Sequence, residues 1–231
     1  MEKYIHSIGL GPGDPELITL KAKRLLEESD IIVTPQSDVL GKSVAREIVL
    51  NFVEESKLMM YYFPMNNDSR ELDRKYGRLA GRILDLLDRG GKVSFVTMGD
   101  PTIFSTSNYL SVKLAEKGVL VRNVPGINTV NGTSALLGLP LCVKGENFGV
   151  YEMPQDVSTA VKLIRRHPTT VFMKVNKKLP TLMEAIEQSH PQAAYLAQKI
   201  GLEGEAVYNL LLKKTPCDGA YLSTAFIRRD G

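Results

Sequence analysis

Three short segments rich in glycine and proline carry most of the chemistry that this sequence suggests. They are residues 9–15 (GLGPGDP), residues 98–106 (MGDPTIFST) and residues 124–129 (VPGINT), and each follows a run of apolar residues. Glycine lets the backbone approach a ligand closely, and proline fixes the conformation of a turn. Carboxylate, amide and hydroxyl groups within the segments can form hydrogen bonds with a ligand. If the three segments lie at a common edge, they predict a single ligand pocket.

The first segment looks at first like a nucleotide-binding loop, but its spacing does not fit one. The third glycine follows the second by two residues instead of three, and prolines stand where an N–H group would be needed. A pyrophosphate-binding loop or a Walker loop is therefore not predicted. The alternative is a tight turn in which Asp14 caps a helix and Pro15 is the first helical residue.

The other two segments place polar side chains directly after strands. Asp100 lies between a glycine and a proline at the end of an apolar run, a place that packing alone explains poorly. Its carboxylate is expected either to accept hydrogen bonds from a ligand or to cap the residues that follow. Asn128 and Thr129 add donors and acceptors in the first turn of the next predicted helix.

The elements around these segments predict an α/β fold, because short apolar runs alternate with amphipathic stretches. Residues 93–98 are apolar on both faces, as in a central parallel strand, and residues 69–88 form a clear amphipathic helix. Ligands bind at the C-terminal edge of such sheets. The second half is richer in adjacent strands, which predicts a mixed sheet. We therefore expect two α/β domains, residues 1–144 with a mainly parallel sheet and residues 145–231.

Composition excludes several classes of function. The 231 residues carry 29 basic and 26 acidic side chains, so the net charge of +3 does not favour a duplex nucleic acid as partner. No apolar run is long enough to cross a membrane, and residues 1–6 do not resemble a signal peptide. Cys142 and Cys217 have no Cys or His nearby in sequence, so neither a disulfide framework nor a protein-bound metal is expected. Two isolated cysteines are typical of a reducing compartment, so we expect a cytoplasmic location.

The three segments, together with Gly138-Leu139-Pro140-Leu141, resemble the tetrapyrrole methylases of the corrin and sirohaem pathways. The resemblance covers nearly the whole chain, and residues 98–110 with the helix before them are most similar to precorrin-2 and cobalt-precorrin-2 C-20 methyltransferases. It implies a homodimer of two-domain chains that bind S-adenosylmethionine in a cleft between the domains and methylate a reduced tetrapyrrole. The alternatives are a family member acting at another ring carbon and a non-catalytic nucleotide-binding module.

Carried over residue by residue, the resemblance implies nine contacts with S-adenosylmethionine: Pro12, Met98, Gly99, Asp100, Ile103, Asn128, Thr129, Met173 and Gly201. Two of these positions depart from the family pattern. Asn128 stands where many relatives have threonine, and residues 199–202 (KIGL) replace the commoner Asn-Gly-Thr type of turn.

The resemblance also indicates which side chains the reaction requires. Methyl transfer from a sulfonium needs orientation more than an activated side chain, so no catalytic residue is assigned. The substrate's carboxylates call for basic partners. Candidates in the second domain, each of which also fits a solvated surface position, are Arg165, Arg166, Lys174, Lys177 and Lys178. His6 could reach the mouth of the cleft, but the role of a satisfied core or edge histidine is favoured for it. Tyr61 and Tyr62, with Phe63, could flank a flat macrocycle, but strand packing explains them equally well.

Overall fold

The computed structural model describes residues 2–36, 43–62, 69–216 and 220–229. The chain divides into two compact units, Met1–Asn128 and Thr129–Gly231, which are treated separately below.

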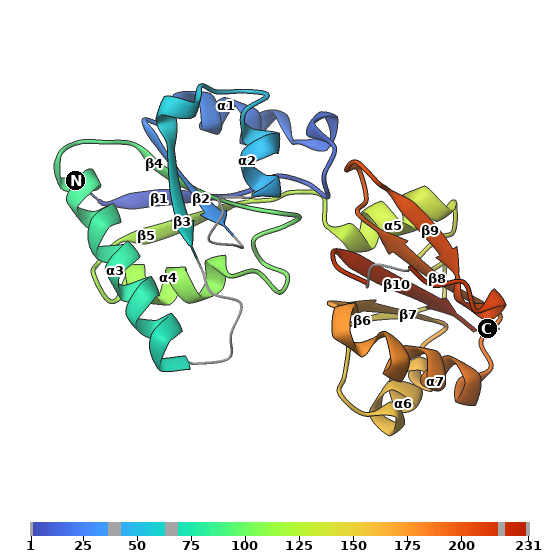
Figure 1. The fold of residues 1–231 in the computed structure, drawn as a ribbon. Helices are drawn as coiled ribbons and strands as arrows, with labels where there is room; N and C mark the ends of the chain where they lie inside the picture. The colour runs from blue at the N-terminus through green and yellow to red at the C-terminus, as the bar shows by residue number, and fades with distance from the viewer. Residues whose placement is uncertain (1, 37–42, 63–68, 217–219, 230–231) are drawn as a thin grey trace. The chain divides into compact units, whose positions relative to one another are not determined.

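The first unit contains a parallel five-stranded sheet with the strand order β3-β2-β4-β1-β5 (Figure 1). The strands are β1 (Tyr4–Gly9), β2 (Ile31–Gln36), β3 (Leu58–Tyr62), β4 (Val93–Thr97) and β5 (Leu120–Val124). Every residue of β4 is buried, which confirms the central strand predicted from its continuous apolar run. Because all pairings are parallel, the C-terminal ends of the strands lie at one edge.

Helices cover both faces of this sheet (Figure 1). On one face α1 (Leu20–Glu28) and α2 (Val44–Val49) pack against a core that includes Ile8 and Val96. On the other face α3 (Ser69–Asp88) and α4 (Ser107–Ala115) pack against a core that includes Phe95. The bounds of α3 are those predicted from its apolar stripe, because that stripe is the surface buried against the sheet.

The beginning of α1 differs from the prediction. Asp14 caps only a 3-10 turn, η1 (Pro15–Leu17), by accepting a hydrogen bond from the Glu16 N–H at 2.8 Å. The backbone is extended at Ile18, and α1 then begins at Leu20 with Thr19 as its N-cap. Asp14 and Thr19 therefore cap two successive helices, whereas the sequence predicted one helix capped by Asp14.

The second unit contains a mixed five-stranded sheet with the order β6-β7-β10-β8-β9. β10 is antiparallel to both of its neighbours, whereas β6 and β7 are parallel. This confirms the predicted mixed sheet, although β9 was not predicted. The strands are β6 (Phe148–Glu152), β7 (Thr169–Met173), β8 (Ala193–Gln198), β9 (Ala206–Asn209) and β10 (Ser223–Arg228).

The helices of the second unit also cover both faces of its sheet (Figure 1). α6 (Val157–Arg166) and α7 (Leu179–Ser189) pack on one face, and α5 (Thr129–Leu137) packs on the other. The compact units divide after Asn128, and Val130 of α5 packs against Val171 and Phe226 of the second sheet. The domain boundary near Gly145 stays a prediction. Two short 3-10 helices, η3 (Asn176–Lys178) and η4 (Leu210–Leu212), join strands and helices in this unit, and η2 (Glu55–Lys57) precedes β3 in the first.

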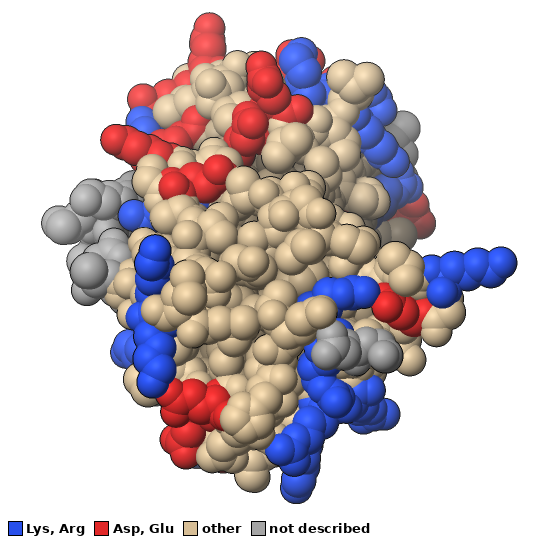
Figure 2. Space-filling model, turned by 90° about the vertical axis from the view of Figure 1, so that its right-hand side faces the viewer, with Lys and Arg blue, Asp and Glu red and all other residues tan. Residues whose placement is uncertain are grey.

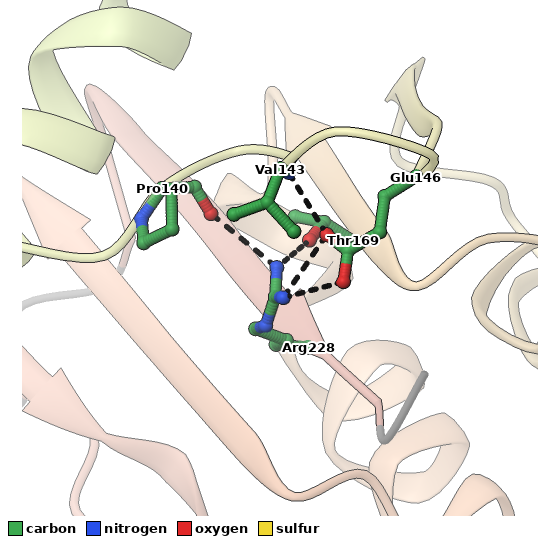
Figure 3. Close-up of polar contacts among 5 residues, drawn as sticks. All are labelled: Pro140, Val143, Glu146, Thr169 and Arg228. Carbon is green, nitrogen blue, oxygen red and sulfur yellow. Dashed lines mark hydrogen bonds and ion pairs between the residues drawn. The ribbon is translucent and has the colours of Figure 1, made fainter.

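The segment after α5 is fastened to the second sheet by Arg228 of β10 (Figure 3). Its guanidinium donates to both Glu146 carboxylate oxygens, at 2.9 and 3.0 Å, and to Thr169 Oγ1 at 2.9 Å. The Val143 N–H donates to Glu146 at 3.1 Å, and this bond, followed by Arg228, holds the pKa of Glu146 below its usual range. We call this group the Arg228 clasp.

Candidate functional site

The three loops singled out in the sequence follow β1, β4 and β5, which are neighbours in the first sheet. They therefore meet at its C-terminal edge. The Gly99 N–H donates to the Gly11 carbonyl at 2.7 Å, and the Gly11 N–H donates to the Gly99 carbonyl at 3.3 Å. This short antiparallel bridge joins the first loop to the second.

Three glycines bring the loop backbones into direct contact. A Cβ atom on Gly9 would lie 2.5 Å from the Gly99 carbonyl oxygen and 2.7 Å from the Gly126 nitrogen. A Cβ atom on Gly126 would lie 2.2 Å from the same carbonyl oxygen. Such distances exclude any side chain at either position, because the obstructing atoms belong to the backbone. We call Gly9, Gly99 and Gly126 the glycine junction.

Asp100 links the second loop to the third. One carboxylate oxygen accepts hydrogen bonds from the N–H and the hydroxyl of Thr102, with the N–H at 2.8 Å. The other accepts from the Gly126 N–H at 3.1 Å. Of the two roles expected from the sequence, the structure thus shows the capping one, and it adds a bond to the glycine junction.

A set of buried hydroxyls fixes the far end of the second loop. Thr97 and Ser105 lie 3.0 Å apart between their hydroxyl oxygens, and the Ser107 N–H donates to Ser105 Oγ at 3.1 Å. Ser7 of β1 and Ser107 are joined at 2.8 Å. All four side chains are buried. Sequence reasoning missed these residues; the available signal was small hydroxyl residues placed within apolar strand runs.

The remaining predicted residues of the first unit also lie in these loops. Pro12 is buried, Ile103 is half-buried, and Met98 packs against the core beneath α1 and α2. Asn128 lies beside the glycine junction, since a Cβ atom on Gly99 would be 3.7 Å from its Cα. The backbone of Phe104 is left-handed, with φ of 48°, and its side chain is exposed.

The predicted residues of the second unit fall at two places. Thr129 is the first residue of α5, and within the described part of the chain its buried hydroxyl has no hydrogen-bond partner. Met173 ends β7, and Gly201 lies in the turn after β8, where its N–H donates to Glu205 at 2.7 Å. β7 and β8 flank β10, and Met173 and Ala197 pair with opposite sides of Thr224. Met173 and Gly201 therefore share one edge of the second sheet.

The basic candidates are divided between two ends of the second unit. Arg165 and Arg166 lie in the last turn of α6, where Arg165 donates to the Gln188 carbonyl at 2.9 Å. Lys177 and Lys178 lie in η3, just after β7, and Lys178 donates to the Met153 carbonyl at 2.6 Å. Lys174 directly follows Met173, so it stands nearest to a predicted site residue.

His6 lies apart from the loop edge, whereas Tyr61 and Tyr62 end β3 at the C-terminal edge of the same sheet, separated from β4 by β2. His6 lines a cavity of about 490 Å³ with Ser29, Ser94 and other residues at the N-terminal ends of β1 and β4. Burial, followed by the charge of Arg122, lowers its pKa. Tyr61 donates to the Lys75 carbonyl at 2.8 Å, and burial raises its pKa. Tyr62 lies beneath the Lys75 ammonium, 4.6 Å from its ring centre.

Among the described residues, no helix is long and apolar enough to span a membrane, and no group of three or more His, Cys, Asp or Glu side chains gathers as metal ligands. Cys142 is exposed and free, and Cys217 lies outside the described residues. On the face drawn in Figure 2, acidic and basic side chains lie around a mainly uncharged middle.

Solved structures of methyltransferases superpose on this chain over nearly its whole length, which shows that they share its fold. The family model for tetrapyrrole (corrin/porphyrin) methylases matches residues 4–216. The chain belongs to this family, which confirms the resemblance found in the motifs. It is thus an S-adenosylmethionine-dependent methyltransferase.

Two named relatives and one solved structure show which methylases this chain resembles. The chain is 32% identical to a probable cobalt-precorrin-2 C(20)-methyltransferase of Methanocaldococcus jannaschii, over 98% of this chain and 96% of that protein. It is 29% identical to a precorrin-2 C(20)-methyltransferase of Sinorhizobium, over 95% and 93% of the two chains. Among solved structures, a uroporphyrin-III C-methyltransferase of Thermus thermophilus complexed with S-adenyl homocysteine superposes with a TM-score of 0.67 at 22% identity, covering 98% of this chain and 97% of that one.

The residues present fit a compact polar cofactor. A Cβ atom on Gly9 or Gly126 of the glycine junction would intrude on neighbouring backbone, so the loops come together closely, and they are held by Asp100 and the buried hydroxyls. In the second unit, the buried Thr129 hydroxyl offers a hydrogen-bonding group that the described residues leave unused.

Proposed function

We propose that this protein transfers a methyl group from S-adenosylmethionine to C-20 of precorrin-2 or of cobalt-precorrin-2 in corrin biosynthesis. Two relatives named for these two reactions align with nearly the whole chain, which supports the choice of ring carbon. Their names differ in whether the substrate holds cobalt. The metal belongs to the substrate in this proposal, and the protein itself binds none.

The observation that carries the proposal is the glycine junction at the C-terminal edge of the first sheet. We assign binding of the methyl donor to the loops that form it and to the predicted positions of the second unit. The residues are Pro12, Met98, Gly99, Asp100, Ile103 and Asn128 in the first unit, and Thr129, Met173 and Gly201 in the second. Asp100 acts here mainly by holding the second and third loops together.

The protein's part in the chemistry is orientation. Bound S-adenosylmethionine supplies an already activated methyl group. The loops must hold this donor in one pose and exclude water, so that the ring carbon approaches in line with the bond that breaks. The ring carbon is itself electron-rich, so a strongly activated nucleophilic side chain is not needed.

Isothermal titration with S-adenosylhomocysteine followed by a turnover assay tests the proposal. We expect binding close to one site per chain, and transfer of ¹³C-methyl label to C-20 when the enzyme is incubated with labelled donor and precorrin-2, with and without cobalt. NMR locates the label. Label at another ring carbon would identify a different methylase of the family, and binding without turnover on any tetrapyrrole would indicate a non-catalytic module. Absence of binding at millimolar ligand would refute the proposal as a whole.

The assembly and location of the protein belong to the same proposal. We expect a homodimer in the cytoplasm, without a nucleic acid or membrane partner. Sedimentation velocity at micromolar concentration tests the first expectation, and fractionation of cells that express the protein tests the second.

A further inference from the structure

Three residues at one edge of the second sheet adopt the left-handed backbone conformation without being glycine. They are Lys174, Lys199 and Leu222, with φ of 57°, 53° and 53°. Lys174 directly follows β7, Lys199 directly follows β8, and Leu222 directly precedes β10. Because β10 lies between β7 and β8 and is antiparallel to both, the three residues stand at the same edge. The Lys199 N–H donates to the Leu222 carbonyl at 2.9 Å, which fixes two of them together.

Such a cluster is costly for the fold. The left-handed conformation brings Cβ close to the backbone carbonyl oxygen, so every residue with a side chain is strained there and glycine is not. Left-handed residues elsewhere in this chain are mostly glycines, including Gly201 two residues after Lys199. Strain that is kept at neighbouring positions points to side chains that are needed for function.

Two of the three strained residues carry an ammonium group. The Lys174 ammonium is about half exposed and lies 3.3 Å from the carboxylate of Glu152, which ends β6 at the same edge. Lys178 lies 3.7 Å from the other oxygen of Glu152. Exposed ion pairs of this kind contribute little to stability, so they do not explain why the strain is kept. They do show that this edge accommodates carboxylates.

We propose that Lys174 and Lys199 bind carboxylate groups of the tetrapyrrole and so determine how the macrocycle is seated. This inference rests on the proposed function, since it takes its substrate class from there. Both residues adjoin predicted contacts of the methyl donor, Met173 and Gly201, so a substrate held by them lies next to the donor. A bound substrate carboxylate competes with Glu152 for the Lys174 ammonium.

The test exploits the strain. Lys174→Gly and Lys199→Gly remove both the charge and the strain, so their thermal unfolding midpoints should equal or exceed that of the parent protein. We expect each variant to raise KM for the tetrapyrrole about tenfold, the loss expected for one charge-assisted hydrogen bond. The affinity for S-adenosylhomocysteine and the value of kcat should each change less than about twofold, which is roughly the effect of a surface substitution that does not contact the ligand. The parent's KM should rise with salt more steeply than that of the double variant.

Two controls separate this role from others. Lys213→Gly removes a left-handed lysine with φ of 55° near the opposite end of the sheet, where it pairs with Glu187, and should leave KM unchanged. Lys174→Asn and Lys199→Asn remove the charge but tolerate the left-handed backbone, and must reproduce the rise in KM.

Unchanged KM in the Gly and Asn variants would overturn the inference while leaving the methylase proposal intact. An equal loss of S-adenosylhomocysteine affinity would also overturn it, because the lysines would then shape the donor site. A parent protein that binds no S-adenosylhomocysteine would instead refute the proposed function.

Discussion

At the scale of single residues, the three loops of the candidate site meet at glycines, and at two of these, Gly9 and Gly126, even a methyl group does not fit. Gly9, Gly99 and Gly126 belong to three different loops, yet their backbones are in van der Waals contact. Asp100 adds a hydrogen bond from its carboxylate to the Gly126 N–H. The geometry of the loop edge is therefore set by residues without side chains, and Asp100, the acidic residue that stands out in the sequence, holds the second and third loops together.

Gly126→Ala should disrupt this arrangement. The new Cβ atom would lie 2.2 Å from the Gly99 carbonyl oxygen, and neither backbone can move without opening the loops. We expect S-adenosylhomocysteine affinity to fall at least tenfold and the free energy of unfolding to fall by about 1–3 kcal/mol. Calorimetric titration and urea denaturation measure the two effects.

A matched substitution separates the junction from a general effect of alanine. Gly77 lies in α3, where a Cβ atom meets nothing within 4 Å, so Gly77→Ala should stabilise the helix by about 0.5–1 kcal/mol and leave ligand affinity unchanged. Parent-like affinity in Gly126→Ala would show that the loops do not form the donor site.

At the scale of elements, the two edges of the first sheet carry different groups. The loops gather at the C-terminal ends of the strands, whereas His6 lies toward the other end of β1, beside Ser94 and the cavity described above. Burial is the main cause of its lowered pKa, followed by the positive charges of Arg122 and Lys21, which outweigh the opposite effect of Glu28. Because its pKa is lowered in the folded protein, protonation of His6 is coupled to folding.

The lowered pKa of His6 predicts a pH-dependent stability. Below about pH 6.5, the ordinary value for histidine, the unfolded chain binds a proton that the folded chain still resists. Stability should therefore fall as the pH decreases from about 7 through the folded-state pKa. In His6→Gln this contribution disappears, so urea denaturation midpoints should decline less between about pH 7 and pH 5. Both proteins should respond alike above about pH 7.5, where the imidazole is neutral in both states, and parallel curves over the whole range would contradict the prediction.

Sequence patterns predicted well those elements whose apolar positions in the sequence are the same positions that become buried in the fold. In α3 an apolar stripe marks the face that packs against the sheet, and in β4 a continuous apolar run marks a strand that is buried on both faces. β9 was missed because its four residues, Ala206–Asn209, lie at the edge of the sheet, where none of them is fully buried, and carry no such run. The three loops could be predicted because glycine and proline mark turns, but the hydroxyls of Ser7 and Ser107, a hundred residues apart, become partners only in the folded chain.

At the scale of the whole molecule, the chain consists of two compact units, each with a layer of helices on both faces of its sheet. Family membership is carried by blocks in both units, since the matched region runs from residue 4 to residue 216. Recognition of the donor is proposed for both, and recognition of the substrate for the edge of the second sheet. Neither unit alone contains all the residues assigned to the site.

Ligand binding should therefore stabilise the protein as a whole. A ligand that binds only the folded state at a hundredfold excess over its Kd adds about 2.7 kcal/mol to the free energy of unfolding. We expect S-adenosylhomocysteine to raise the thermal midpoint of the parent protein and of Gly77→Ala. The midpoint of Gly126→Ala should not respond at the same concentration. Differential scanning calorimetry measures these shifts. A thermal midpoint of the parent protein that is the same with and without the ligand would count against binding.

The position of β10 in the second sheet has a consequence for biosynthesis. β10 occupies the central place between β7 and β8, yet it is the last strand in chain order, and it bears Arg228 of the Arg228 clasp. Until residues 223–228 emerge from the ribosome, β7 and β8 each present an unpaired inner edge, the kind of surface that recruits other strands. The first sheet has all its strands by residue 124, so a nascent chain can complete one half of the enzyme while the other still needs protection from aggregation.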